Sequence, residues 1–207
     1  AEDFVPLARL TIDPVVLAAR AAGPFPDLPA VIARARAEPG AVSYATPGIL
    51  SHLHLATERF ARLAGIELNH IPFQGTAPGV TAVLAGQVDL IAVPPANVTD
   101  PATRLRPLAI ALEAPLPDLP NTPTFREHRI DLTLAGWRGL FAPRGTPPEV
   151  TEALERAVLD TLADPDFIAN FRRLGLTPAP LGAAAFAAFW SADRAAVEPL
   201  VAGIPRG

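Results

Sequence analysis

Two residue types on which many protein functions depend are missing from this sequence of 207 residues. It contains no cysteine, and all 17 of its basic residues are arginines because lysine is absent as well. The lack of cysteine excludes disulfides, thiol nucleophiles and zinc–thiolate sites. The lack of lysine excludes a P-loop lysine and any Schiff base with a substrate or with pyridoxal phosphate.

Positive charge is scarce too. The 17 basic residues are outnumbered by 21 acidic ones, which gives a formal net charge of −4, and no group of arginines forms a basic face. Since nucleic-acid backbones need such a face, we expect no nucleic-acid partner. The longest uncharged window, residues 68–88, contains prolines and polar side chains and cannot span a bilayer. No signal peptide is visible, as in a mature secreted chain.

Short apolar runs alternate with amphipathic segments along the chain. The runs predict strands at residues 4–10, 14–19, 42–45, 66–71, 88–93, 105–112 and 132–142. The amphipathic segments predict helices at 28–37, 51–64, 76–86, 148–162, 165–174 and 183–201. Alternation of this kind predicts an α/β fold with mainly parallel strands.

Two long extended segments, near residues 4–19 and 132–142, flank the compact middle of the chain. A hinged protein of two lobes is connected in this way. We therefore expect a middle lobe over residues 12–136 and a second body built from residues 1–11 and 137–207.

Twice, a predicted strand leads through a short loop of glycine and hydroxyl residues into a predicted helix. Gly48 and Gly75 would let a ligand approach the backbone, and hydroxyl donors come from Thr46, Ser51 and Thr76. A helix N-terminus attracts carboxylate or phosphate, and ligands of open α/β sheets bind where strands end. The same pattern is also typical of ordinary helix caps, which Ser51 and Thr76 would provide.

Enzymatic and metal chemistry find little support. Ser51 stands beside His52, but no G-x-S-x-G elbow or G-x-G-x-x-G loop occurs, so a hydrolase using Ser51 and a histidine is the less favoured hypothesis. His52 and His54 are two residues apart and do not share a helical face. Only Glu58 stands at ligand spacing from His54, so we predict no metal site and no cofactor.

The segment from 136 to 147 places aromatic residues and two arginines among glycines. Arg138 or Arg144 could pair with an anionic ligand. For Arg144 we favour a solvent-facing position.

Several motifs resemble, in order and spacing, the Bug-type receptors of tripartite tricarboxylate transporters. The motifs are YATPGILSHLHLATERFARLAGIELNHIPFQG, VTAVLAGQVDL, LPNTPT and WRGLFAPRGTPP, and the resemblance extends over nearly the whole chain. It implies a two-lobe periplasmic binding protein of the second type that is not an enzyme. Such a receptor closes around a small mono-, di- or tricarboxylate and delivers it to membrane transporter subunits.

Carried over residue by residue, the resemblance places the ligand on two loops. The implied ligand residues are Thr46, Gly48 and Ser51 in the first loop and Gln74, Gly75 and Thr76 in the second. His54 matches a helix-start histidine of the family, for which we expect a structural role.

This sequence departs from the family pattern at the loops. Leu50 stands where glycine is usual, His52 where a small hydroxyl residue is usual, and Gln74 where lysine is common. Val93-Pro94-Pro95 replaces a more polar segment. Because these changes remove a cation and polar groups and add bulk and an imidazole, we expect either a ligand less charged than citrate or an altered pocket.

Members of the family usually begin about one βαβ unit earlier, so the resemblance implies an incomplete first lobe and weak ligand binding. A second copy of the chain could cover apolar sheet left exposed there, which would give a homodimer. We expect a periplasmic location. The alternative is a sensing or interaction module, derived from such a receptor, that reports a ligand to a partner without transport.

Overall fold

The computed structural model of the protein describes residues 3–202, which divide into two compact units. Unit 1 combines the residues up to Asp13 with those from Trp137 onward, and unit 2 is Pro14–Gly136. No helix among the described residues has the length and apolar character needed to cross a membrane.

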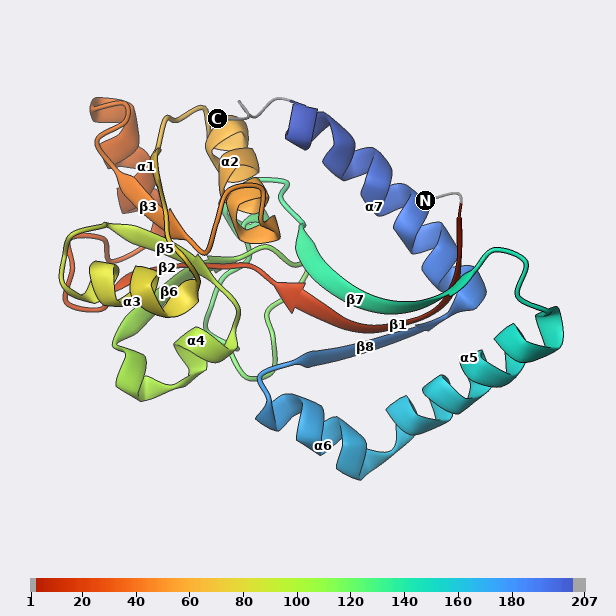
Figure 1. Cartoon of the computed structure of the whole chain (residues 1–207). Helices are drawn as coiled ribbons and strands as arrows, with labels where there is room; N and C mark the ends of the chain where they lie inside the picture. The colour runs from red at the N-terminus through yellow and green to blue at the C-terminus, as the bar shows by residue number, and fades with distance from the viewer. Residues whose placement is uncertain (1–2, 203–207) are drawn as a thin grey trace. The chain divides into compact units, whose positions relative to one another are not determined.

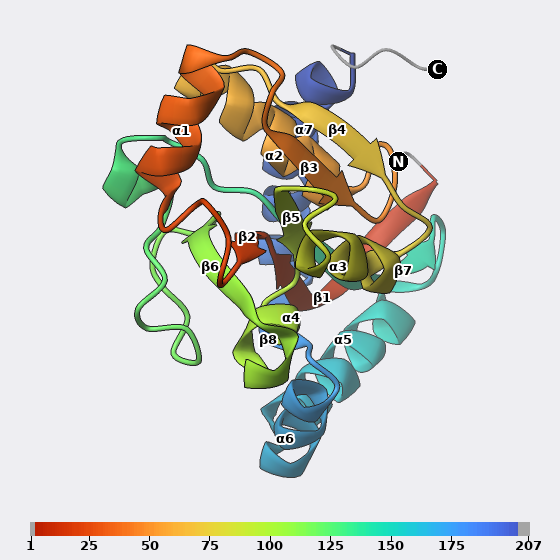
Figure 2. The ribbon, with the colours of Figure 1, turned by 90° about the vertical axis from the view of Figure 1, so that its left-hand side faces the viewer.

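Unit 2 contains a five-stranded sheet. Its strands are β2 (Val16–Arg20), β3 (Ser43–Thr46), β4 (Asn69–Pro72), β5 (Leu90–Val93) and β6 (Leu105–Ile110), in the order β4-β3-β5-β2-β6 (Figure 2). β3 pairs in parallel with β4 and β5, whereas β2 pairs antiparallel with both β5 and β6. Four strands therefore share one direction and β2 alone is reversed.

The α/β class is as predicted, but the expectation of mainly parallel strands is corrected to mixed sheets. β2 follows β1 (Phe4–Pro14) after a single residue and pairs antiparallel with both of its neighbours. Hydrophobic periodicity carries no information about strand direction, which is why the sequence could not show the reversal.

Helices cover both faces of this sheet. The helical segments of unit 2 are α1 (Leu28–Ala37), α2 (His52–Ala64), α3 (Thr76–Leu84), the short α4 (Ala96–Thr99), and the 3-10 turns η1 (Pro101–Thr103) and η2 (Arg126–His128). Neighbouring strand residues point to opposite faces. Tyr44 stacks against His54 of α2, and Ala45 contacts Gly79 of α3, so α2 and α3 cover opposite faces (Figure 1).

The predicted ends of α2 are confirmed. Ser51 is the N-cap, with its hydroxyl accepting from His54 N, and Gly65 ends the helix in the left-handed conformation with φ 62°. Ile66 N then donates to Ala61 O at 3.0 Å to close the helix end. That bond keeps Ile66 out of the sheet, so β4 begins at Asn69 and not at residue 66.

The predicted cap of α3 is wrong. Gly75 is the N-cap, with φ 104°, and Thr76 is already the first helical residue, so no side chain caps this helix. The chain enters α3 through a positive φ that glycine adopts without strain. Sequence alone places a threonine near a helix start but does not separate the cap from the position after it.

Unit 1 has a smaller sheet. β1, β7 (Ala135–Pro143) and β8 (Thr177–Gly182) lie in the order β7-β1-β8, with β1 and β8 antiparallel. Its helices are α5 (Pro148–Ala163), α6 (Pro165–Arg173) and α7 (Ala183–Ala202). α7 runs along the sheet (Figure 1), where Phe186 is fully buried and its ring lies 5.3 Å from Trp137 and 5.1 Å from Phe141.

Candidate ligand-binding site

Three parallel strands of unit 2 end at one edge of the sheet. Thr46 is the register partner of Pro72, and Ala45 is the partner of Ile91, so β3, β4 and β5 finish side by side. The loops that follow them are residues 46–51, 72–75 and 94–95. The structure thus brings together the two loops that the sequence singled out, at the edge where open α/β sheets bind ligands.

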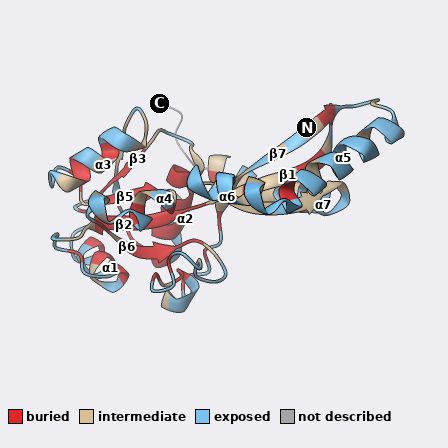
Figure 3. Ribbon diagram, turned by 90° about the horizontal axis from the view of Figure 1, so that it is seen from below, coloured by how far each residue is buried: buried red, intermediate tan, exposed pale blue. Residues whose placement is uncertain are grey.

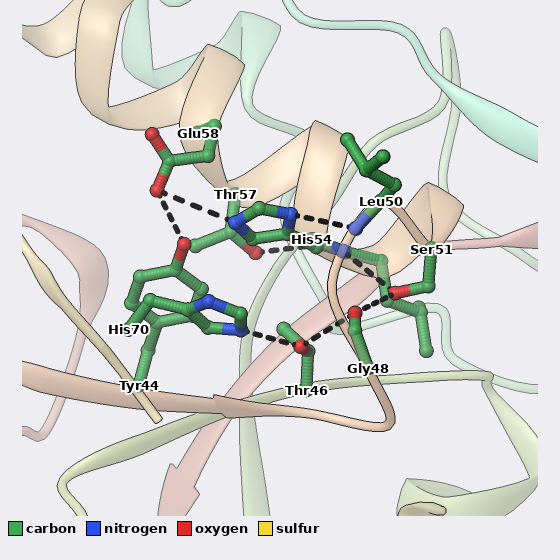
Figure 4. A network of polar contacts seen from close by, with 10 residues as sticks. Tyr44, Thr46, Gly48, Leu50, Ser51, His54, Thr57, Glu58 and His70 are labelled. Atoms are coloured by element: carbon green, nitrogen blue, oxygen red, sulfur yellow. Dashed lines mark hydrogen bonds and ion pairs between the residues drawn. The ribbon is translucent and has the colours of Figure 1, made fainter. Parts of the chain in front are cut away.

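The hydroxyls of the first loop are used largely within the loop itself (Figure 4). Ser51 Oγ donates to Gly48 O at 2.9 Å and accepts from His54 N at 3.2 Å. Thr46 is buried, and its Oγ1 lies 2.6 Å from His70 Nε2 and 3.2 Å from Gly48 O. These side chains shape the loop. A ligand would meet backbone N–H groups and the remaining lone pairs of the hydroxyls.

Ser51 has no catalytic base. Its hydroxyl donates to the Gly48 carbonyl, and the nearby ring of His54 accepts from Leu50 N through Nδ1 at 3.1 Å. A serine nucleophile would need its hydroxyl directed at a histidine ring. The geometry therefore does not support the hydrolase hypothesis.

Leu50 lies at the tip of the first loop in an unusual conformation. Its φ is 62°, in the left-handed region, and its side chain is exposed like that of Ile49. The resemblance places glycine at this position in related chains, which fits a backbone conformation that favours glycine. Here the bond from Leu50 N to His54 stabilises the conformation.

Three aromatic rings stack beneath this loop. The His54 and His70 centroids are 4.1 Å apart with an angle of 18° between the ring planes, and Tyr44 and His70 are 4.8 Å apart at 25°. The Tyr44 hydroxyl donates to Glu58, whose Oε1 also lies 3.9 Å from His54 Nε2. The structural role expected for His54 is confirmed by the bond that it accepts from Leu50 N, whereas no role was predicted for His70 from the sequence.

Burial keeps both histidines neutral at pH 7. Burial lowers the pKa of His54, although the nearby Glu58 carboxylate acts to raise it. Burial and the neighbouring His54 lower the pKa of His70 to about 4. Burial and the bond to Glu58 raise the pKa of Tyr44. Because His54 Nδ1 accepts from Leu50, the neutral ring carries its proton on Nε2, which faces Glu58.

The second loop is more open. Gln74 is exposed, and Gly75 and Thr76 are partly exposed at the start of α3. Phe73 N donates to Thr46 O at 2.9 Å and ties this loop to the first one.

No charged residue occurs in the three loops, at positions 46–51, 72–76 and 93–96. Within residues 3–202 no group of three or more His, Asp or Glu side chains could hold a metal ion. Arg138, which could have paired with an anionic ligand, pairs with Asp13 inside unit 1 at 2.6 and 2.7 Å. The edge can hold a carboxylate through backbone N–H groups, hydroxyls and an amide, but not through an ion pair from its own loops.

An α/β unit with two glycine-containing loops at one edge of its sheet, connected to a second unit by two crossings of the chain, is typical of two-lobe solute-binding proteins. The family follows from comparison with known proteins. A sequence model described as "Tripartite tricarboxylate transporter family receptor" matches residues 1–203, and the chain belongs to this family.

Two curated relatives support the assignment. The UPF0065 protein of the tcbD-tcbE intergenic region of Pseudomonas sp. strain P51 is 34% identical over 181 residues, which are 86% of this chain and 54% of that protein. Protein BugT of Bordetella pertussis is 31% identical over 180 residues, 86% of this chain and 55% of BugT. The chain thus spans about half the length of these relatives.

Solved structures confirm the fold. A TctC solute-binding protein from Polaromonas, solved without ligand, has a TM-score of 0.87 at 30% identity and aligns with 98% of this chain and 70% of its own. R. palustris Rpa4515 with adipate has a TM-score of 0.80 at 27% identity and aligns with 96% of this chain and 67% of its own. MatC from Rhodopseudomonas palustris with bound malate has a TM-score of 0.69 at 31% identity and aligns with 84% of this chain and 60% of its own.

Proposed function

We propose that this protein is an extracytoplasmic receptor that captures a small organic carboxylate and presents it to the membrane subunits of a tripartite transporter. The observation that carries this proposal is the shared sheet edge of β3, β4 and β5, with the two glycine-containing loops brought together at the start of α2 and α3. Membership of the receptor family supports the same conclusion and a periplasmic location.

In this proposal unit 2 is one lobe of the receptor, and unit 1 belongs to the other. A ligand that contacts both lobes stabilises the closed state over the open one, and the transporter would recognise that difference. The function is capture and release without chemical change. Ser51, bonded to a backbone carbonyl and without a base, fits this reading.

The ligand we propose is a dicarboxylate or monocarboxylate with an apolar body. Two relatives of known structure hold adipate and malate, both dicarboxylates. In this chain the three loops provide no charged side chain, and the exposed Ile49 and Leu50 add apolar surface at the same edge. A tricarboxylate would bring three charges to loops with no cation to balance them, whereas adipate would place its methylene chain against apolar groups.

Calorimetric titration with adipate, malate and citrate tests this choice. We expect adipate to bind most tightly and citrate most weakly. Tightest binding of citrate would contradict the proposed ligand class, and binding of none of the three acids would contradict the proposed function.

A matched pair of variants sharpens the test. Gln74→Lys restores the cation that the resemblance places in the second loop, and we expect it to raise citrate affinity about tenfold. Gln87→Lys puts the same charge on an exposed position after α3 and should leave citrate affinity unchanged. Equal effects of both substitutions would indicate a general charge effect and no contact with Gln74.

A further inference from the structure

Two imidazole rings hold the first ligand loop, one at each end. His70 Nε2 lies 2.6 Å from Thr46 Oγ1 where β3 ends, and His54 Nδ1 accepts from Leu50 N at 3.1 Å just before α2. Between these anchors lie only residues 47–49. Figure 4 shows both rings on the same side of the loop. The conformation of the loop therefore depends on two groups that bind and lose protons.

The two rings also contact each other. Their centroids are 4.1 Å apart and their planes nearly parallel, and the Tyr44 ring is stacked 4.8 Å from His70 and 6.4 Å from His54. A positive charge on either ring would face the other ring across this short distance. Protonation of one ring therefore disfavours protonation of the other. The contact of His70 with Thr46 does not require a neutral ring, because Nε2–H can donate to Thr46 Oγ1 while that hydroxyl donates to Gly48 O.

The hydrogen bond between Leu50 N and His54 Nδ1 is the contact that protonation would break. A proton on Nδ1 would turn the acceptor of the Leu50 N–H into a donor, so two N–H groups would face each other. A leucine at φ 62° has an unfavourable backbone conformation. The hydrogen bond from Leu50 N to His54 Nδ1 offsets this cost. Loss of the bond would let Leu50 return to an ordinary conformation and change the shape of the loop.

The charged and titratable groups around the pair come from three elements. Glu58 of α2 faces His54 Nε2 at 3.9 Å and accepts from Tyr44 of β3, while His70 comes from β4. His52, also on α2, has its ring against Gly136 instead. Asp89, just before β5, bonds to Ser43 N and Oγ at 2.9 and 2.8 Å. Only Glu58 favours a charged His54, and burial outweighs it.

From this arrangement we propose that His54 and His70 are positioning residues of the first ligand loop and that His54 is its proton-sensitive latch. A neutral His54 holds residues 46–51 in the ligand-binding shape, and uptake of a proton by His54 in mild acid releases the loop and weakens ligand binding. The ligand part of this inference rests on the function proposed above, whereas the motion of the loop does not.

The loop can be followed without any ligand. Nitrogen-15 NMR of the ligand-free protein between pH 7.5 and 4.5 reports the His54 ring nitrogens and the amides of Gly48 and Leu50. We expect neutral His54 to carry its proton on Nε2, and the Leu50 amide signal to move with the same midpoint as the His54 ring. A Leu50 amide that is indifferent to the titration of His54 would overturn the latch.

The ligand part uses adipate as the probe, titrated calorimetrically at pH 7 and pH 5. We expect its Kd to rise about tenfold, within the limit of tenfold per pH unit that one linked proton allows. His54→Asn places an amide oxygen near the position of Nδ1 and keeps an acceptor that does not titrate, so binding should persist at pH 7 and lose its pH dependence. His54→Leu should weaken binding at both pH values.

His128→Asn, in η2 and outside the loops, is the matched control and should behave like the wild type. The same pH dependence in His54→Asn as in the wild type would overturn the proposal. If adipate does not bind at any pH but the Leu50 amide still follows His54, the latch stands and the proposed ligand is wrong. Rescue by asparagine also separates the latch from a merely structural role, because folding of His54→Asn is checked by the same spectra.

Discussion

Unit 2 and unit 1 are both built from a sheet with helices, but they differ sharply in their cores. In unit 2, residues 16–19 of β2 and all of β5 are buried, and aliphatic side chains from four strands and α3 pack on one face. In unit 1, only Leu162 of α5 and α6 is buried. Figure 3 shows the contrast, with buried residues concentrated in the sheet of unit 2 and exposed residues along α5 and α6.

The apolar surface that unit 1 does not bury lies on its outside. Exposed large hydrophobic residues of the described chain fall mostly in unit 1, at Phe4, Val5, Leu140, Val150, Leu154 and Leu174. Some of them line an apolar groove of about 260 Å³ between the sheet and α5 and α6, together with Leu10, Phe167 and Phe171. The proposed ligand loops are thus supported by a full core, whereas unit 1 relies on the aromatic contacts of α7.

Removal of one phenylalanine ring from each unit should give the largest difference in stability between the two units. Phe60 of α2 is fully buried and 5.1 Å from Phe125, so Phe60→Ala should cost unit 2 about 3–5 kcal/mol. Phe171 of α6 is only partly buried, and Phe171→Ala should cost about 1 kcal/mol. Urea unfolding followed by circular dichroism measures both. Equal losses would contradict the difference in packing.

Glycines of unit 1 give the next largest effect. A Cβ at Gly139 would lie 2.3 Å from Phe186 Cζ and 3.1 Å from Ala8 O, so Gly139→Ala should destabilise unit 1 by about 1–3 kcal/mol. At Gly182 the close atom is Oε1 of Glu155, the end of a flexible side chain, so Gly182→Ala should cost less. Both tryptophans, Trp137 and Trp190, lie in unit 1 and report its unfolding by fluorescence. A larger loss at Gly182 would contradict this packing.

Acid should lower the stability of unit 2 more than that of unit 1, because all four histidines lie in unit 2. The pKa of His54 is lowered, and that of His70 is lowered to about 4, from the ordinary 6.5. Between those values the unfolded chain binds more protons than the folded one, so the stability of unit 2 falls as pH falls from 6.5 toward 4.

Parallel urea titrations at pH 7 and pH 5 measure this effect. The midpoint by circular dichroism should fall, while the midpoint by tryptophan fluorescence should move less. A double variant, His54→Asn with His70→Gln, should reduce the fall. Identical shifts by both signals would place the titrating groups outside unit 2.

Association is the smallest predicted effect. If a second copy covers the apolar groove of unit 1, light scattering should show a dimer that Leu154→Glu converts to a monomer. Leu63→Glu, at an exposed leucine of unit 2, is the control and should leave the dimer intact. A monomeric wild type would remove the homodimer prediction.

Much of the fold could be predicted because local patterns decide it. Apolar periodicity located the helices, and Ser51 and Gly65 marked both ends of α2. The sequence could not show the reversed direction of β2 or the cap at Gly75, because one depends on how the chain enters the sheet and the other on a backbone angle. The two loops proposed to bind the ligand were singled out by their composition, and the structure places them at one edge of the sheet.

The ring stack beneath the loops could not be predicted with confidence from spacing. Tyr44, His54 and His70 come from three elements, and only the pairing of β3 with β4 makes Tyr44 and His70 neighbours. The sequence did show that His54 and Glu58 are four residues apart. This pair was considered only as metal ligands, and no further ligand was found to support a metal site. Donor and acceptor geometry instead makes His54 a support for Leu50.

The most direct measurement of the central claim is an adipate titration followed by nitrogen-15 NMR of the backbone amides. The account predicts that the signals of Gly48, Leu50, Gly75 and Thr76 shift first and saturate together, with little change along α5 and α6. Shifts confined to the groove of unit 1, or a uniform response without saturation, would contradict a ligand site at the carboxyl ends of β3 and β4.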